Sequence, residues 1–109
     1  MNSLTALADP TRRQIVELLS QGERAAGEIT ERFALSAPAI SQHLKVLREA
    51  GLVVMRVEGQ RRIYRLDPEG LREIDGWLGK VRRFWSESLD GLERGLREAA
   101  AKDQQRKTS

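Results

Sequence analysis

The spacing of apolar residues changes at Gly51, and this change limits the folds that are open to the chain. Before Gly51, apolar side chains recur at the three- and four-residue steps of a helix, at Ile40, Leu44 and Leu47. After it, residues 52–66 form two runs rich in β-favouring residues, one on each side of a glycine-containing turn. The sequence therefore predicts a helix that is followed at once by a β-hairpin.

Proline and capping residues mark where the helices begin. Asp9-Pro10 and Asp67-Pro68 each place an N-cap residue before a proline that suits the first helical turn. Ser36 is a good N-cap for the helix described above, and only two or three residues separate that helix from a shorter one over about residues 26–33. Two short helices joined in this way, the second with a polar outer face, are typical of a helix-turn-helix.

The order of these elements is the layout of a winged helix-turn-helix. We expect a mainly α fold with a β-hairpin, in the order α-α-α-α-β-β-α. With 109 residues, the chain is long enough for one small domain and too short for two. We place that domain at residues 1–98, and we expect the polar residues 99–109 to be a disordered tail.

Positive charge is concentrated in the middle third of the chain. Residues 36–66 contain six Lys and Arg against two Glu, which gives this segment a net charge of +4. Such an uneven distribution indicates a polyanionic partner, although a solvated basic surface explains the charge alone about as often. The chain has no cysteine and no apolar stretch as long as a membrane span. We therefore expect a cytoplasmic protein without disulfides or a membrane partner.

Three segments carry a family resemblance: LADPTRRQIVELL, SAPAISQHLKVLREAGLV and VEGQRRIYRLDP, which cover most of residues 4–68. Together they resemble the ArsR/SmtB family of bacterial transcriptional repressors. The middle segment, with its S-Q-H-L-K-x-L-R-x-A-G-L-V pattern, is quite specific, whereas the other two are weak alone. The resemblance implies a sequence-specific, DNA-binding transcriptional regulator, expected to be a homodimeric repressor of a palindromic operator in its own or a neighbouring promoter.

The helix that begins after Ser36 carries the residues that we expect to meet DNA. A recognition helix reads base edges in the major groove with short polar side chains and amides. Lys45 suits a phosphate, as does the helix N-terminus. His43 borders the inward stripe, so packing and DNA contact are about equally expected from position alone, and the resemblance favours DNA. The expected contacts are Ser36, Ser41, Gln42, His43 and Lys45.

The hairpin is the expected wing. Its polar, arginine-rich tip suits phosphates or a minor groove, although some of its arginines can simply stay solvated. Arg65 is a weaker candidate, and Tyr64 is expected in the core. The wing residues that we assign to DNA binding are Arg56, Gln60, Arg61 and Arg62.

The last helical region carries a long apolar stripe at heptad-like steps. A stripe of this kind usually packs on its own domain, but a surplus of this size indicates a subunit interface. The resemblance implies a homodimer built from the first and last helices. Gly76 and Gly79 leave open whether the region is one helix or two. The expected interface residues are Leu4, Leu7, Leu78, Val81, Trp85, Leu89 and Leu92.

Many relatives in this family sense metals, and this chain lacks the residues for it. Where arsenic-type members have thiolate ligands, the chain has Ala25 and Gly27, and its last region has no histidine of the zinc-type set. Carboxylates alone make a poor site for a transition metal. We therefore predict no metal and no cofactor, with any small-molecule effector unknown.

An enzyme is not expected, because one histidine, no cysteine and scattered serines give no nucleophile–base pair. The alternative function is a winged-helix module for protein–protein interaction without DNA binding. Such a module would not need Lys45 together with an arginine-tipped wing. A DNA-binding relative of the MarR type is a further alternative, although those chains are usually longer.

Overall fold

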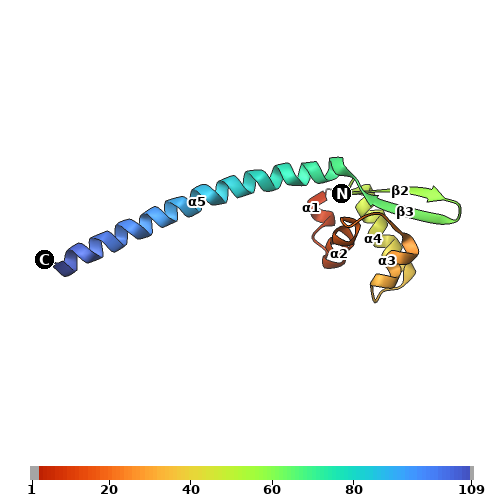
Figure 1. The fold of residues 1–109 in the computed structure, drawn as a ribbon, viewed down its shortest axis with the longest axis horizontal. Helices are drawn as coiled ribbons and strands as arrows, with labels where there is room; N and C mark the ends of the chain where they lie inside the picture. Colours follow the sequence, from red (N-terminus) through yellow and green to blue (C-terminus); the bar gives the residue numbers. More distant parts are fainter. Residues whose placement is uncertain (1–2, 109) are drawn as a thin grey trace. The chain divides into compact units, whose positions relative to one another are not determined.

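The fold is that of a computed structural model, which describes residues 3–108, with side chains up to residue 103. The chain divides into two compact units, one ending at Ile74 and one beginning at Asp75. The elements are α1 (Ser3–Ala6), α2 (Pro10–Leu19), β1 (Arg24–Ala25), α3 (Ala26–Arg32), α4 (Ala37–Glu49), β2 (Val53–Glu58), β3 (Arg61–Leu66) and α5 (Pro68–Thr108). Figure 1 labels all of them except β1.

The helices α2 and α4 begin at the capping residues that the sequence predicts. The Asp9 side chain accepts hydrogen bonds from the backbone N–H groups of Thr11 at 2.8 Å and Arg12 at 3.1 Å. Ser36 Oγ accepts one from the backbone N–H of Ala39 at 3.3 Å. These bonds satisfy donors that the first turn of a helix leaves without an intrahelical partner. The caps therefore fix the starts of both helices.

The core of the first unit is apolar and contains the predicted inward stripe of α4. Ile40, Leu44 and Leu47 are buried, as is Tyr64 of β3, which confirms their expected roles. Burial of side chains this size supplies roughly 1.5–3 kcal/mol each before the entropy cost of ordering them. The buried cluster consists of Ala6, Ile15, Leu19, Ile29, Ile40, Leu44, Leu47, Leu52, Val53 and Tyr64.

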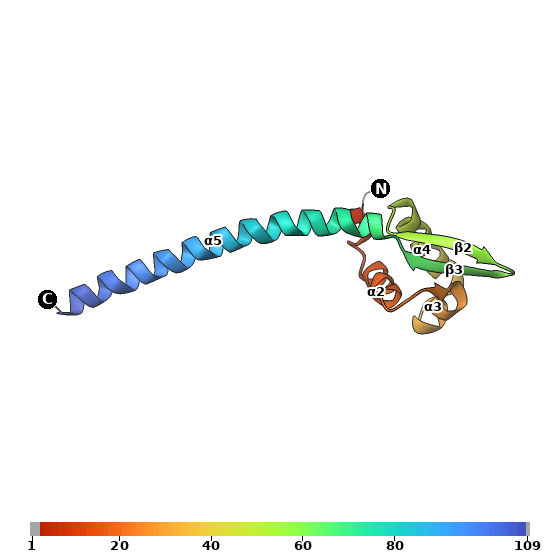
Figure 2. The same cartoon turned by 45° about the horizontal axis from the view of Figure 1, so that its top comes forward.

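The predicted hairpin is present, and one further strand joins it. β2 and β3 lie side by side as an antiparallel pair (Figure 2), with Val53 opposite Leu66 and Glu58 opposite Arg61. Gly59 has a φ of 60°, which suits the first central position of a two-residue turn. The short strand β1 pairs with the other edge of β3, so the sheet order is β1-β3-β2. β1 was not predicted from the sequence, because two residues are too few to show an alternating pattern.

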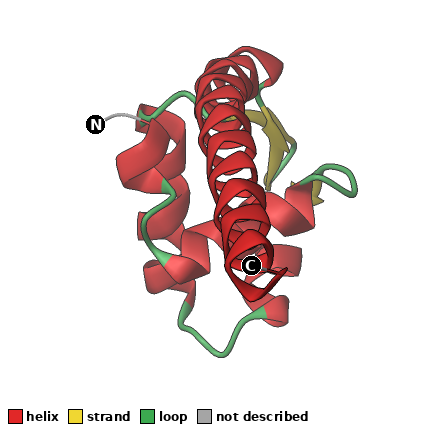
Figure 3. Cartoon of the chain, turned by 90° about the vertical axis from the view of Figure 1, so that its left-hand side faces the viewer, coloured by secondary structure: helices red, strands yellow, loops and turns green. Residues whose placement is uncertain are grey.

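Helices make up most of the chain, and strands are confined to the sheet of the first unit (Figure 3). α5 is a single helix, so neither Gly76 nor Gly79 interrupts it. Its helical backbone continues to Thr108, through most of the segment in which the sequence predicts a disordered tail. The placement of the domain boundary at residue 98 stays a prediction. Among residues 3–108, no helix is both long and apolar enough to cross a membrane.

Candidate nucleic-acid interface

The outer face of α4 carries polar side chains above a buried apolar stripe. Three of these side chains are exposed. Ser41 and Gln42 lie between the buried residues Ile40 and Leu44, and Lys45 directly follows Leu44. Because the helix rotates by about 100° per residue, burial of one stripe directs the intervening residues outward. The core therefore presents these three side chains on an accessible surface.

Ser36 is also exposed, but its hydroxyl already has a structural role as the N-cap of α4. Pro38 has no N–H and Ala39 donates to Ser36, so the backbone N–H groups of Ser36 and Ala37 are those that this helix end can offer to an anion. Lys45 Nζ lies 4.0 Å from Glu49 Oε1, and its side chain is 64% exposed. An exposed pair one turn apart contributes only a few tenths of a kcal/mol, about 0.3–0.5. The ammonium group of Lys45 is therefore available to a phosphate.

His43 is half-buried and lies beside the start of α2. Its Nδ1 is 3.4 Å from Nη1 of Arg12, and Arg12 Nε donates a hydrogen bond to the carbonyl oxygen of Ala6 at 2.6 Å. Arg12 thus connects the end of α1 with the outer edge of α4. The structure places His43 between the packed stripe and the exposed face, in agreement with its position in the sequence pattern.

The wing tip is polar and exposed. Gln60, Arg61 and Arg62 are all exposed, and Arg61 Nη2 donates to Glu28 Oε1 of α3 at 3.1 Å. The same carboxylate oxygen accepts from the backbone N–H of Ala25 at 3.2 Å, at the start of α3. Glu28 therefore links the wing tip to α3, a contact that was not predicted from the sequence.

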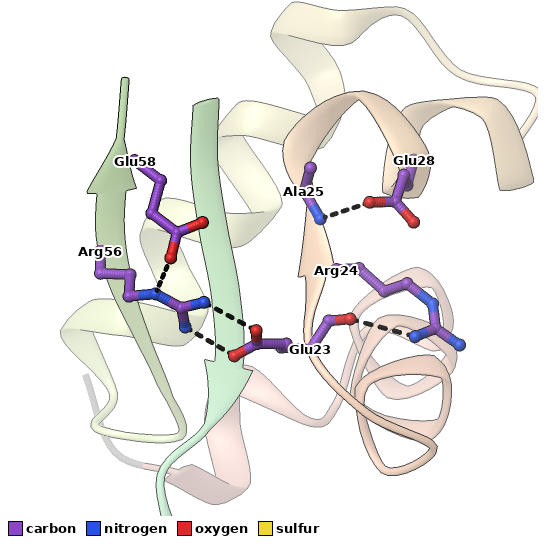
Figure 4. Close-up of polar contacts among 6 residues, drawn as sticks. All are labelled: Glu23, Arg24, Ala25, Glu28, Arg56 and Glu58. Carbon is purple, nitrogen blue, oxygen red and sulfur yellow. Dashed lines mark hydrogen bonds and ion pairs between the residues drawn. The ribbon is translucent and has the colours of Figure 1, made fainter. Parts of the chain in front are cut away.

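Arg56, predicted as a wing contact to DNA, is held by two carboxylates (Figure 4). Its Nη1 and Nη2 donate to Glu23 Oε2 and Oε1 at 2.6 and 2.7 Å, and its Nε donates to Glu58 Oε1 at 3.1 Å. The hydrogen bonds from Arg56 hold the pKa of the Glu23 carboxyl below its usual range. The bonds to Glu23, and then to Glu58, raise the pKa of the Arg56 guanidinium. These partners distinguish Arg56 from the other wing arginines.

The predicted interface residues lie on α1, just after it, and on α5. Within the single chain Leu7 packs against the core and Val81 is half-buried, whereas the others are exposed. Trp85 and Leu92 have exposed fractions of 57% and 59%, although both side chains are large and apolar. Phe84 and Leu96 are exposed in addition, so the apolar surface of α5 is larger than the predicted interface.

The segment in which thiolate ligands of a metal-sensing relative would be expected has no cysteine. Ala25 is buried at the start of α3, and Gly27 has open space where a Cβ would lie. In the part of the chain that the structure describes, no cluster of three or more His, Cys, Asp or Glu is arranged to hold a metal ion.

Comparison with known proteins decides the family. Residues 9–54 match the family described as bacterial regulatory protein, arsR family. The chain is also 51% identical to the HTH-type transcriptional regulator Rv2034 of Mycobacterium tuberculosis over 86 residues, which are 79% of this chain and 78% of that protein. The chain belongs to the ArsR family. Its members are transcriptional regulators, so the predictions of a DNA-binding regulator and of a protein that is not an enzyme are confirmed.

Other ArsR relatives agree in sequence and in fold. The transcriptional repressor SdpR of Bacillus subtilis is 39% identical over 71% of this chain and 86% of its own. The crystal structure of a possible transcriptional regulator for arsenical resistance has a TM-score of 0.70 and 44% identity, over 74% of this chain and 84% of that one. The solution structure of the homodimeric winged helix-turn-helix DNA-binding domain Mb0332 from Mycobacterium bovis has a TM-score of 0.61 and 35% identity, over 72% and 73%. The winged helix-turn-helix prediction is therefore confirmed.

Proposed function

We propose that the chain acts as a homodimer that represses transcription by binding a palindromic operator in its own or a neighbouring promoter. The observation that carries the proposal is the exposed polar face of α4, capped by Ser36 and supported from below by the buried stripe. A helix of this kind fits the major groove, where its polar side chains can pair with base edges. The repressor SdpR and the homodimeric Mb0332 domain support the two finer parts of the proposal.

The residues of α4 divide by chemistry into base readers and phosphate binders. Gln42 has both a donor and an acceptor, which suits the N6 and N7 edge of adenine. Ser41 is short enough to reach either a base edge or a phosphate, whereas Lys45 supplies a point charge for a phosphate. The first turn of α4 and the wing residues Gln60, Arg61 and Arg62 add phosphate contacts or enter a minor groove.

The homodimer gives the operator its symmetry. One helix-turn-helix makes few base contacts, and two copies held in one assembly combine their contact energies on a single site. The large exposed apolar side chains of α5 provide an apolar surface that a second copy would cover, and Leu4 is exposed on α1. Two recognition helices related by a two-fold axis read half-sites about one helical turn apart, roughly 34–36 Å.

A salt titration with a labelled duplex of the chain's own promoter tests the proposal. Because phosphate contacts release counterions, log affinity should fall linearly with log salt concentration, with a slope of roughly 0.9 for each phosphate neutralised.

The Gln42→Ala variant tests base recognition by α4. It should relax the preference at one base pair of each half-site, at a cost of roughly 1–3 kcal/mol of binding free energy. The matched control is Gln21→Ala, at an exposed position outside the interface, which should leave the preference unchanged. Absence of binding to any duplex at low salt would instead favour the protein-binding alternative.

A further inference from the structure

We propose that Arg56 and Glu23 are a positioning pair, which fixes the wing against the turn before β1, and that Arg62 is the wing arginine that neutralises phosphate. The proposal rests on the DNA-binding function proposed for α4 and the wing. It gives Arg56 a role different from the DNA contact that the sequence predicts, and it assigns a role to Glu23, which carries no expectation from sequence.

The pair spans the sheet from one edge to the other. Arg56 belongs to β2, Glu23 directly precedes β1, and β3 lies between these two strands. Figure 4 shows the Arg56 side chain crossing β3 to reach the Glu23 carboxylate. The two parallel N–H···O bonds, at 2.6 and 2.7 Å, form a bidentate fork that fixes orientation as well as distance. The pair therefore ties the hairpin to the segment that leads into α3.

Three of the five N–H donors of Arg56 are occupied, including donors on both edges through which a guanidinium can form a fork. All three guanidinium nitrogens donate to carboxylates, because Glu58 takes the Nε–H at 3.1 Å. The two carboxylates neutralise the charge of this guanidinium locally, so it attracts a phosphate less than an unpaired arginine does. A bidentate phosphate contact would have to displace at least one carboxylate from the guanidinium. Arg56 is consequently a poor phosphate ligand in this arrangement.

The strand register places Arg62 on the opposite face of the hairpin. Arg56 pairs with Ile63, and the next pair towards the tip is Val57 with Arg62. Since paired residues share a face and successive residues alternate, Arg62 and Val57 lie on the face away from Arg56. Among residues 3–103, Arg62 has no ion-pair partner, and Val57 is 63% exposed beside it. The two faces therefore differ towards the tip: Arg56 and Arg61 on one face are paired with carboxylates, whereas Arg62 on the other is unpaired.

The test compares the salt dependence of binding for four single variants and one double variant. Fluorescence anisotropy with a labelled random-sequence duplex at low salt measures phosphate contacts without knowledge of the operator. Arg62→Gln should lower the salt slope by roughly 0.9 for each phosphate that the variant no longer neutralises. Arg56→Gln and Glu23→Gln should each weaken binding roughly two- to fivefold with the slope unchanged. The double variant should be no weaker than either single variant, because the two residues act as one unit.

Arg56→Lys separates a positioning role from a phosphate contact. Lysine keeps the charge but cannot form the bidentate fork, so its affinity should fall as far as that of Arg56→Gln. If Arg56→Gln lowered the salt slope of binding as much as Arg62→Gln does, the proposal would be overturned. So would tighter binding by Glu23→Gln, or unchanged binding by all Arg56 and Glu23 variants. A wild-type chain that binds no duplex would instead overturn the proposed function, which separates the two failures.

Discussion

Gly70 lies in the first turn of α5 against the chain that leaves α4. A Cβ at this position would be 2.9 Å from the carbonyl carbon of Gly51 and 3.3 Å from Cα of Leu52. Both neighbours are backbone atoms, which cannot move aside as a flexible side chain can. The backbone N–H of Asp67 also donates to the Leu52 carbonyl oxygen at 2.8 Å, so the two segments are tied together at this place.

We predict that Gly70→Ala destabilises the first unit by roughly 1–3 kcal/mol, because the added methyl group forces two backbone segments apart. Chemical unfolding followed by circular dichroism measures the change in the free energy of unfolding. Gly27→Ala is the matched control, since a Cβ there meets nothing within 4 Å and the helix gains up to about 1 kcal/mol of propensity. Equal stabilities of the two variants would show that Gly70 is not a close-packing position.

The contact between Arg12 and His43 predicts a single tautomer. A guanidinium can only donate, so a hydrogen bond to Nδ1 requires Nδ1 to be the acceptor and leaves the proton on Nε2. The Nε2–H is then the donor that His43 would use in the predicted contact with DNA. Because His43 is the only histidine in the chain, a long-range 1H–15N spectrum reports it without overlap.

The spectrum of the neutral imidazole should show the Nε2–H form, and Arg12→Met should produce a mixture of tautomers. Arg13→Met serves as the control, because Arg13 donates to the carbonyl oxygens of Leu7 and Ala8 and has no contact with His43. A wild-type chain with its proton on Nδ1 would contradict the observed pairing.

At the level of elements, capping and apolar spacing predicted α2, α4 and the hairpin. These signals are local, since a cap and its helix lie within a few residues of each other. The strand β1 was missed because it depends on pairing with β3, about 40 residues later. The Arg56–Glu23 contact joins residues 33 apart in sequence. Neither has a local pattern, so the exposed face of α4 could be predicted while the carboxylate partners of the wing could not.

Asp9 provides a test of the α2 cap through pH. Hydrogen bonds from the backbone N–H of Arg12 lower the pKa of the Asp9 carboxyl from its ordinary value of 3.8, partly opposed by desolvation. Because this pKa is lower in the folded state, the ionised Asp9 carboxylate stabilises the fold. This contribution to the free energy of unfolding is complete above the pKa of the unfolded state and is lost as pH falls through the pKa of the folded state.

Asp9→Ala should therefore cost roughly 0.5–2 kcal/mol at neutral pH and less as the wild-type carboxyl becomes protonated. Unfolding curves recorded along a pH series measure the difference between wild type and variant. Asp9→Asn keeps the acceptor and removes the charge, so most of the stability should remain at neutral pH. A cost of Asp9→Ala that stays constant down to the most acidic pH would rule out the charged cap.

At the level of the whole molecule, DNA binding as proposed depends on a second copy of the chain. Burying exposed apolar area contributes roughly 25 cal/mol per Å2 before the costs of association. Trp85→Asp or Leu92→Asp should shift the protein towards monomer and weaken operator binding, although neither residue is among the proposed DNA contacts. Arg94→Asp places the same side chain on the opposite face of α5 and should leave the dimer intact. Sedimentation velocity measures the oligomeric state, and DNA affinity is measured on the same samples. If Trp85→Asp and Leu92→Asp both matched wild type, the proposed α5 interface would be contradicted, and a monomeric wild type would contradict the dimer.

Selection from a random duplex library with the purified chain tests the central claim most directly. A homodimer that reads DNA through α4 should enrich a two-fold symmetric sequence, with half-site centres about one helical turn apart. The Gln42→Ala variant should enrich the same sequence with one position of each half-site relaxed. An asymmetric sequence, no enrichment over the starting library, or an enriched sequence identical in every position for Gln42→Ala would contradict the proposed mode of DNA recognition.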